Sequence, residues 1–181
     1  MTSSHPCVLV IHSSRFGQST KIAQAVCDEL AVKGVQTDLV ALDADTAPDA
    51  GRHDGLVMVI SVRYGHFDKH ALRLVQQHRA WLDAHPTMLM TVSLTARTPE
   101  KRDPAVHVYT HKFLEQAAWT PKHTEVVAGM LEYPRYKIWD RLAIQMIMTM
   151  TKGPTDPKCV IEYTDWGRVR EATDEFAATM E

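Results

Sequence analysis

Short, continuous apolar runs recur along the chain and mark the predicted strands. Cys7–Ile11, Gly55–Ser61 and Thr87–Leu94 are apolar at nearly every position. This pattern is typical of strands that are buried on both faces, as in the middle of a parallel sheet. Gln36–Leu42 shows the alternation of a second strand, and Glu125–Leu131 is predicted as the fifth.

Segments with helical spacing lie between these runs. Apolar residues at helical intervals predict helices over Thr20–Lys33, Lys69–Leu82, Val106–Ala118 and Trp166–Met180, the last capped by Asp165. Strands that alternate with helices predict an α/β domain with a parallel sheet. A length of 181 residues is typical of one domain, so we expect residues 1–181 to form a single domain.

The regular alternation stops after the fifth predicted strand. Pro134–Thr151 is predicted as a helix that is apolar on nearly all faces, and Lys158–Tyr163 as an extended segment that completes the fifth strand. The apolar half of the helix is only about 15 Å long, which is half of a bilayer core. Three interpretations stay open: packing on the domain's own core, contact with a membrane or a lipid-like substrate, or an oligomer interface.

The turn after the first strand has the composition of an anion site. Ser13–Ser19 joins a buried strand to a helix, so the free N–H groups and the dipole of the helix start favour a negative charge there. Gly17 is its only glycine, so neither glycine-rich nucleotide motif is matched. Hydroxyl groups without a lysine favour a monophosphate. An ordinary helix cap by Ser19 or Thr20 is the alternative.

Two further turns follow the third and fourth predicted strands, and ligands bind at this edge of open α/β sheets. Val62–Phe67 contains Tyr64 and Phe67, which can stack on a flat ring, and Gly65, which lets the backbone come close. Thr95–Pro104 is basic. The alternatives are a loop with surface aromatic residues and a solvated basic loop.

Composition excludes several classes of protein. The net charge of -2 gives no support for bulk nucleic-acid binding. Cys7, Cys27 and Cys159 are far apart and form no C-x-x-C pair, which favours a reducing compartment over a disulfide or zinc framework, and no metal is expected. No signal-peptide pattern is present at the N-terminus. We therefore expect an intracellular protein that is soluble or attached to a membrane surface.

These elements look like a flavodoxin-like three-layer fold with a five-stranded parallel sheet of order 2-1-3-4-5, and Ser13–Ser19 resembles the flavodoxin FMN phosphate loop. Nearly the whole chain resembles the family of bacterial quinone-dependent protoporphyrinogen oxidases. The resemblance is carried by Ser13, Arg15, Gly17, Gln18, Val62–His66, Ala96–Arg102, Lys112–Leu114, Ala128–Gly129, Tyr133–Tyr136, Asp140–Arg141 and Tyr163–Trp166. Residues 132–158 look like that family's insertion. Phe16 departs from the small or acidic residue expected in the phosphate loop.

The resemblance implies FMN as cofactor and the oxidation of protoporphyrinogen IX to protoporphyrin IX in heme biosynthesis, in three two-electron steps. The acceptor would be a membrane quinone, menaquinone or ubiquinone. The implied FMN contacts are Ser13, Ser14, Arg15, Phe16, Gly17, Gln18, Ser19, Val62, Arg63, Tyr64, Gly65, Ser93, Leu94, Thr95, Ala96 and Arg97.

The remaining expectations concern the substrate and the membrane. The two propionates of the substrate need cations, and the candidates are Arg63, Arg97, Lys101, Arg102 and Arg135. His66 is the candidate proton acceptor, with a structural hydrogen bond as the alternative role. The Pro134–Thr151 helix would attach a cytoplasmic protein to the inner-membrane surface, and homo-oligomerisation is left open.

Three other functions remain open at this point. The first is a flavodoxin-type electron carrier, the second a flavin-dependent NAD(P)H:quinone reductase, and the third a cofactor-free scaffold that docks a partner through Pro134–Thr151. Carriers present an acidic rim, whereas the turns here are basic, which counts against the first.

Overall fold

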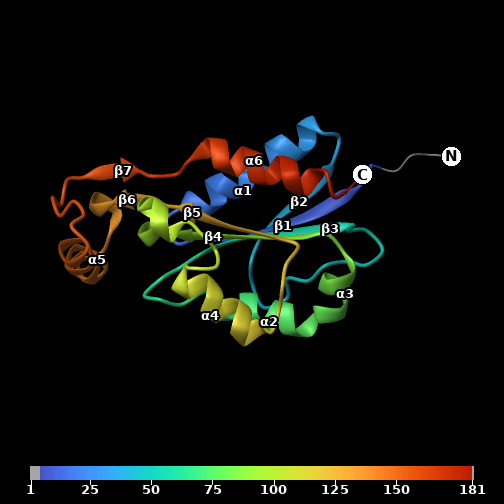
Figure 1. The fold of residues 1–181 in the computed structure, drawn as a ribbon, viewed down its shortest axis with the longest axis horizontal. Helices are drawn as coiled ribbons and strands as arrows, with labels where there is room; N and C mark the ends of the chain where they lie inside the picture. The colour runs from blue at the N-terminus through green and yellow to red at the C-terminus, as the bar shows by residue number, and fades with distance from the viewer. Residues whose placement is uncertain (1–4, 181) are drawn as a thin grey trace.

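The computed structural model describes residues 5–180, and a five-stranded parallel sheet forms its centre (Figure 1). The order in the sheet is β2-β1-β3-β4-β5, and every neighbouring pair is parallel. The predicted 2-1-3-4-5 order is therefore confirmed. The strands are β1 (Cys7–Ser13), β2 (Gln36–Ala41), β3 (Gly55–Ser61), β4 (Thr87–Ser93) and β5 (His123–Ala128).

Helices cover both faces of the sheet (Figure 1). On one face lie α1 (Gln18–Val32) and α6 (Trp166–Ala177), and on the other lie α2 (Lys69–Gln77), α3 (Arg79–Ala84) and α4 (Val108–Ala117). Successive residues of a strand point to opposite faces, so Val8 and Val10 join the first apolar layer while Leu9 and Ile11 join the second. The continuous apolar runs thus belong to strands that are buried on both sides.

Two of the predicted helices on the face of the sheet that α2, α3 and α4 cover differ from the structure. The segment predicted as one helix over Lys69–Leu82 is two helices, with the break at His78, where the backbone leaves the helical region (φ -111°, ψ 21°). Leu74 of α2 and Leu82 of α3 both pack into the same apolar layer, which periodicity along one straight helix does not foresee. The helix predicted from Val106 begins at Val108, because the His107 side chain caps it, and Val106 stays exposed.

The predicted fifth strand is also different. It ends at Ala128, and Met130–Glu132 forms a separate strand, β6, that pairs antiparallel with β7 (Val160–Glu162). The extended segment Lys158–Tyr163 therefore pairs with β6 and does not complete the fifth strand of the main sheet. Gly129 lies at the junction, where its carbonyl accepts a hydrogen bond from the backbone N–H of Tyr163 (3.1 Å).

A helix, α5 (Ile138–Met150), lies between β6 and β7. It is shorter than the predicted Pro134–Thr151 helix, because Tyr133–Arg135 forms a separate 3₁₀ turn and Pro134 belongs to that turn. Buried Leu131, Tyr133, Tyr136 and Met148 form a small core with Phe16, Leu94 and Ile144. One side of α5 is thus covered by the domain itself. None of the helices in residues 5–180 is both long and apolar enough to cross a membrane.

Candidate active site

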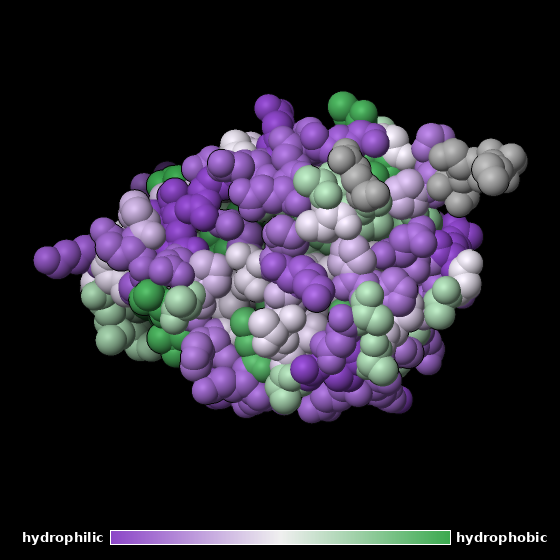
Figure 2. Space-filling view, turned by 45° about the vertical axis from the view of Figure 1, so that its right-hand side comes forward, coloured by the Kyte–Doolittle hydropathy of each residue, from purple (hydrophilic) through white to green (hydrophobic). Residues whose placement is uncertain are grey.

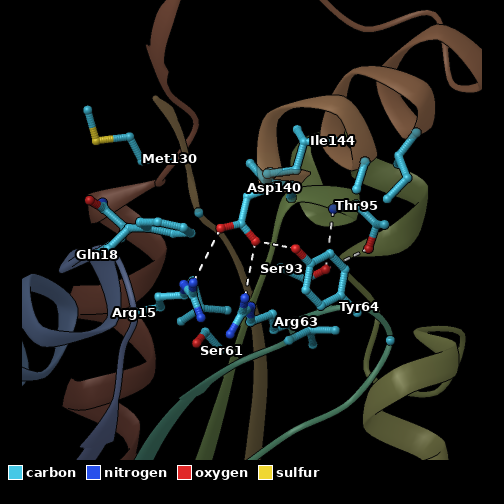
Figure 3. Close-up of a pocket in the computed structure, with 18 of the residues that line it drawn as sticks. Arg15, Gln18, Ser61, Arg63, Tyr64, Ser93, Thr95, Met130, Asp140 and Ile144 are labelled. Atoms are coloured by element: carbon cyan, nitrogen blue, oxygen red, sulfur yellow. Dashed lines mark hydrogen bonds and ion pairs between the residues drawn. The ribbon is translucent and has the colours of Figure 1, made fainter. Parts of the chain in front are cut away.

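A cavity of about 490 Å³ opens at the carboxyl edge of the sheet. The turns after β1, β3 and β4 form its floor and sides, and α5 forms a further wall (Figure 3). Its volume lies within the range of about 300–1,000 Å³ that is typical of small-molecule sites. The cavity therefore lies at the edge of the sheet where the three turns are predicted to meet.

The first turn exposes the start of a helix to this cavity. Gly17 has a left-handed backbone (φ 94°) at the N-cap position, and α1 begins at Gln18. Among residues 5–180, no side chain caps the helix. The alternative in which Ser19 or Thr20 is the cap is therefore wrong, because both lie inside the first helical turn and the Thr20 hydroxyl bonds the His12 ring instead (3.2 Å). The first N–H groups of the helix have no partner within it.

Two buried polar atoms of this turn have no partner among the described residues. They are the Ser19 Oγ and the Gln18 Oε1, both within residues that line the cavity. An unpaired buried hydroxyl is costly unless something else satisfies it. A phosphate at the N-terminus of α1 would accept from the Ser19 hydroxyl and from the free N–H groups, and it would be favoured by the helix dipole. The turn fits a phosphate group.

The second turn is a tight reversal that presents Tyr64 at the cavity. Arg63 and His66 exchange two backbone hydrogen bonds (2.8 and 2.9 Å), and the two residues between them, Tyr64 and Gly65, both have positive φ (48° and 77°). Positive φ at both central residues is the geometry of a type I′ turn. Glycine is also needed because an added Cβ would come within 3.2 Å of the Tyr109 ring. The Arg63 guanidinium carbon lies 4.8 Å from the Tyr64 ring centre.

The third turn is held by a buried chain of hydrogen bonds. Thr91 Oγ1 lies 2.7 Å from Thr110 Oγ1, which lies 2.7 Å from His107 Nδ1. The other ring nitrogen of His107, Nε2, lies 3.1 Å from Thr95 Oγ1, which lies 2.8 Å from Ser93 Oγ. Of these five hydrogen-bonded residues, only Ser93 and Thr95 line the cavity. Thr91, His107 and Thr110 connect them to the core under α4.

The cap of α4 shows which atoms in this series of hydrogen bonds donate and which accept. The backbone N–H of Thr110 donates to His107 Nδ1, so that nitrogen is an acceptor and the proton of the neutral ring lies on Nε2. Nε2 therefore donates to Thr95, whose own hydroxyl proton is left for Ser93 or for a ligand. Burial, with the nearby charge of Lys101, lowers the pKa of His107 and keeps the ring neutral. The chain thus delivers hydroxyl donors to the cavity.

The 132–158 segment is joined to the first turn by side chains. The Phe16 ring packs on the Tyr136 ring with centroids 4.7 Å apart, and Arg135 Nη1 donates to the Phe16 carbonyl (2.9 Å). Phe16, the departure from the expected phosphate loop, is therefore the contact of that loop with the insertion. Asp140 of α5 is ion-paired with Arg15 (3.3 Å) and Arg63 (3.1 Å) and accepts from the Tyr64 hydroxyl.

Most of the predicted cofactor contacts lie in the cavity wall. These are Ser14, Arg15, Phe16, Gln18, Ser19, Val62, Arg63, Tyr64, Gly65, Ser93, Leu94, Thr95 and Arg97. Three do not lie there. Ser13 donates to Asp68 (3.2 Å), Gly17 shapes the turn from behind, and Ala96 is buried against Val126 and Ala128. The cofactor contacts themselves stay a prediction.

The predicted substrate cations are separated by the structure. Arg63 faces the cavity, whereas Arg97 is held by the Thr151 carbonyl and hydroxyl (2.9 and 2.7 Å) at the end of α5. Arg102 bonds the Ala96 carbonyl (3.0 Å), and Arg135 bonds Glu132 (3.2 Å). Arg102, Arg135 and Lys101 do not line the cavity. The candidate base His66 is exposed and borders a smaller hollow beside Lys69 and Lys112.

Sequence reasoning missed a group of lining residues. They are Ser61, Val92, Tyr109, Gly129, Met130, Tyr136, Asp140, Ala143, Ile144, Met146, Ile147 and Met148. Most belong to β6, α5 and their junctions. The signal that could have indicated them was the apolar helix itself, since a helix that is apolar on several faces requires more than one covering surface.

The comparisons with known proteins agree with this geometry. Residues 9–158 match the model of the family described as flavodoxin domain. A protein of Escherichia coli strain K12 named Protoporphyrinogen IX dehydrogenase (quinone) is 37% identical over 93% of both chains. A protein of the same name from Leishmania major is 37% identical over 98% of this chain and 78% of its own. The chain belongs to the flavodoxin-like family of quinone-dependent protoporphyrinogen IX dehydrogenases.

Solved structures agree with the flavodoxin-like fold of this family. A short-chain flavodoxin associated with a bacterial microcompartment gives a TM-score of 0.54 at 13% identity, over 97% of this chain and 99% of its own. Oxidised flavodoxin 1 from Bacillus cereus gives 0.52 at 14% identity, over 95% and 97%. Identities this low show the fold alone. The flavodoxin domain and the phosphate-fitting turn together indicate a flavin site at this edge.

We predict that His107→Asn keeps the cap of α4 but loses the hydrogen bond that positions the Thr95 hydroxyl. Asparagine still accepts from the Thr110 N–H, but its shorter side chain cannot reach Thr95. We expect the helix to form and the free energy of unfolding to fall by about 1–2 kcal/mol, measured by urea denaturation.

The pH dependence gives the control. The folded-state pKa of His107 lies below its ordinary value of 6.5, so the unfolded chain binds the proton first and stability falls as the pH drops below about 6.5. His107→Asn removes this contribution, while half-buried His12, whose pKa is also lowered by desolvation, keeps its own. An unchanged pH dependence between about pH 7.5 and about pH 5.5 would contradict the assignment.

Proposed function

We propose that this protein is an FMN-dependent dehydrogenase that oxidises protoporphyrinogen IX to protoporphyrin IX and passes the electrons to a membrane quinone, in heme biosynthesis. The observation that carries the proposal is the construction of the cavity. One end is a phosphate-fitting turn of flavodoxin type, and the opposite wall is the apolar helix α5. The names of the 37% identical relatives support the substrate and the acceptor.

FMN fits the residues at this edge. Its phosphate would lie on the Ser14–Ser19 turn, with the Ser19 hydroxyl as a donor that is otherwise unpaired. Its ring would lie between the Tyr64 and Leu94–Thr95 turns, where the Ser93 and Thr95 hydroxyls are oriented by His107. When bound, FMN would supply the hydride-transfer chemistry of the site, and the protein would position it.

The protein's own residues contribute position and environment. Ala143, Ile144 and Ile147 of α5 line the cavity with apolar surface, which suits a porphyrinogen macrocycle and keeps water from the reacting centre. Arg15 and Arg63 of the facing turns supply positive charge beside this apolar wall. The apolar wall with cations at its edge matches an apolar ring that carries carboxylate arms.

The outer side of α5 supports contact with a membrane surface. Trp139, Leu142, Met146 and Met150 follow one another at helical spacing and are 78%, 50%, 62% and 78% exposed. Figure 2 shows hydrophobic residues gathered at the end of the molecule that carries α5 in Figure 1. Met146 also lines the cavity, so the stripe is continuous with its mouth. A quinone dissolved in the bilayer would meet the cavity there.

Charge around the stripe favours an anionic lipid surface. Residues 132–158 contain five basic and three acidic side chains, and Lys137 and Arg141 flank Trp139. Basic residues attract anionic headgroups while tryptophan and leucine enter the interface. We therefore propose peripheral attachment to the cytoplasmic face of the inner membrane through α5. A flavodoxin-type carrier or an NAD(P)H:quinone reductase remains the alternative function, and the carrier lacks a reason for this stripe beside the cavity.

The function is tested by redox titration. We expect the purified protein to be yellow and to release FMN on denaturation. Under anaerobic conditions protoporphyrinogen IX should bleach the flavin spectrum, and a quinone should restore it. Bleaching by NAD(P)H but not by protoporphyrinogen would assign a reductase, and bleaching by neither would favour a carrier.

The phosphate turn is tested by Ser19→Ala. Loss of one charge-assisted hydrogen bond of about 1.5 kcal/mol weakens FMN binding about tenfold. The matched control is Thr20→Val, because the Thr20 hydroxyl bonds His12 and is not needed for phosphate. Titration of the apoprotein with FMN, followed by fluorescence, measures both. Equal affinities for the wild type and Ser19→Ala would contradict the proposed phosphate position.

The membrane contact is tested with vesicles that contain anionic lipid. A double variant, Leu142→Glu with Met150→Glu, should reduce cosedimentation with such vesicles about tenfold or more, since it puts two charges into the apolar stripe. The control is Val108→Glu, because Val108 on α4 is an apolar residue whose exposed fraction (71%) lies between those of Leu142 and Met150. Unchanged binding of the double variant would refute attachment through α5.

A further inference from the structure

Asp140 is a buried carboxylate in the wall of the cavity. Its side chain is 7% exposed and lies between the guanidinium groups of Arg15 and Arg63, with the Tyr64 hydroxyl as a third donor. Figure 3 shows Asp140 entering the cavity from α5, while the three donors rise from the first and second turns of the sheet edge. The donors and the acceptor thus come from opposite walls.

The charges of this cluster do not balance. Two guanidinium groups face one carboxylate, and both arginine side chains remain about two-fifths exposed (40% and 42%). Arg15 and Arg63 form no ion pair with any other carboxylate among residues 5–180. The other cation in the wall, Arg97, is occupied by Thr151. Arg15 and Arg63 are therefore the cations that a bound carboxylate would meet.

We propose that Arg15, Arg63 and Tyr64 form the subsite for a propionate carboxylate of the substrate, and that Asp140 is an internal carboxylate that holds this subsite until the substrate replaces it. The proposal rests on the proposed function, since it assigns the substrate's carboxylate to that site. Planar guanidinium groups are the preferred donors for carboxylates, and a second carboxylate cannot share the same donors without repulsion.

The chemistry of Asp140 favours this role over that of a general base. The hydrogen bonds from Tyr64 and Arg63, with the positive charges of Arg15 and Arg63, lower the pKa of Asp140, which makes it a stable anion and a poor proton acceptor. Docking of α5 also has other support. Met148 is fully buried, Arg97 bonds Thr151 at its end, and Phe16 packs on Tyr136. Asp140 can therefore leave the arginines without releasing the whole segment.

The test compares two ligands of the flavin-loaded protein. Protoporphyrin IX carries both carboxylates, and its dimethyl ester carries none. In Asp140→Asn the internal competitor is gone, so the diacid should bind on the order of tenfold more tightly than to the wild type. The diester should bind equally to both proteins. Arg63→Gln should lose the preference for the diacid. Binding is measured by equilibrium titration of the flavin absorbance.

Two controls make this result specific. Asp140→Glu restores the negative charge and should return the diacid affinity toward that of the wild type. Asp156→Asn removes the same charge from an exposed position of the same segment and should change neither affinity. Unchanged or weaker diacid binding by Asp140→Asn, or an equal change for the diester, would overturn the proposal. A loss of turnover without tighter diacid binding would assign Asp140 to proton transfer.

A second measurement needs no porphyrin and separates the two proposals. Glutarate, a plain dicarboxylate, should replace Asp140 and speed amide hydrogen exchange over 138–150 in the wild type, relative to chloride at equal ionic strength. Arg63→Gln should not respond. If neither porphyrin binds but glutarate has this effect, the carboxylate subsite stands and the proposed function fails. If glutarate has no effect and Asp140→Asn does not favour the diacid, the subsite is refuted.

Discussion

The parallel register of β1, β3 and β4 is the constraint on which the rest of this molecule depends. Because neighbouring strands run in the same direction, their carboxyl ends and the turns that follow them meet at one edge. A phosphate-fitting helix start, an aromatic reversal and a pair of oriented hydroxyls therefore surround one cavity. Antiparallel pairing of any of these strands would send its turn to the opposite edge.

The 132–158 segment turns this common edge into a more specific cavity. Its contacts with the first turn combine an aromatic pair, Phe16 with Tyr136, and a charge cluster around the buried Asp140. The apolar pair and the small core around Tyr133 hold the segment in place, whereas the charge cluster lies where a ligand can compete for it. The apolar contacts and the charge cluster are thus different contacts of the same 132–158 segment.

Much of the fold could be predicted because the buried parallel strands have a distinctive apolar pattern. The predictions were wrong where the local pattern does not show which segment a strand pairs with or a helix packs against. Glu125–Leu131 is continuously strand-like, yet the chain leaves the main sheet at Gly129 because β6 pairs with β7 instead. The helix over Lys69–Leu82 is broken at His78 so that both parts pack on one layer. Pairing and packing partners distant in the sequence decide both cases.

The sequence by itself determined the alternation of strands with helices and the three turns at one edge. It also determined the residues that give the first turn its affinity for an anion. Only the tertiary structure decided which cations face the cavity. Arg63 and Arg102 are equally basic in the sequence, but one meets Asp140 while the other is held by the Ala96 carbonyl. The charge of a side chain is fixed by the residue type, whereas its ion-pair or hydrogen-bond partner depends on which distant segment packs against it. For this reason the pairing of Asp140 with Arg15 and Arg63, 125 and 77 residues away in the chain, became visible only in the folded molecule.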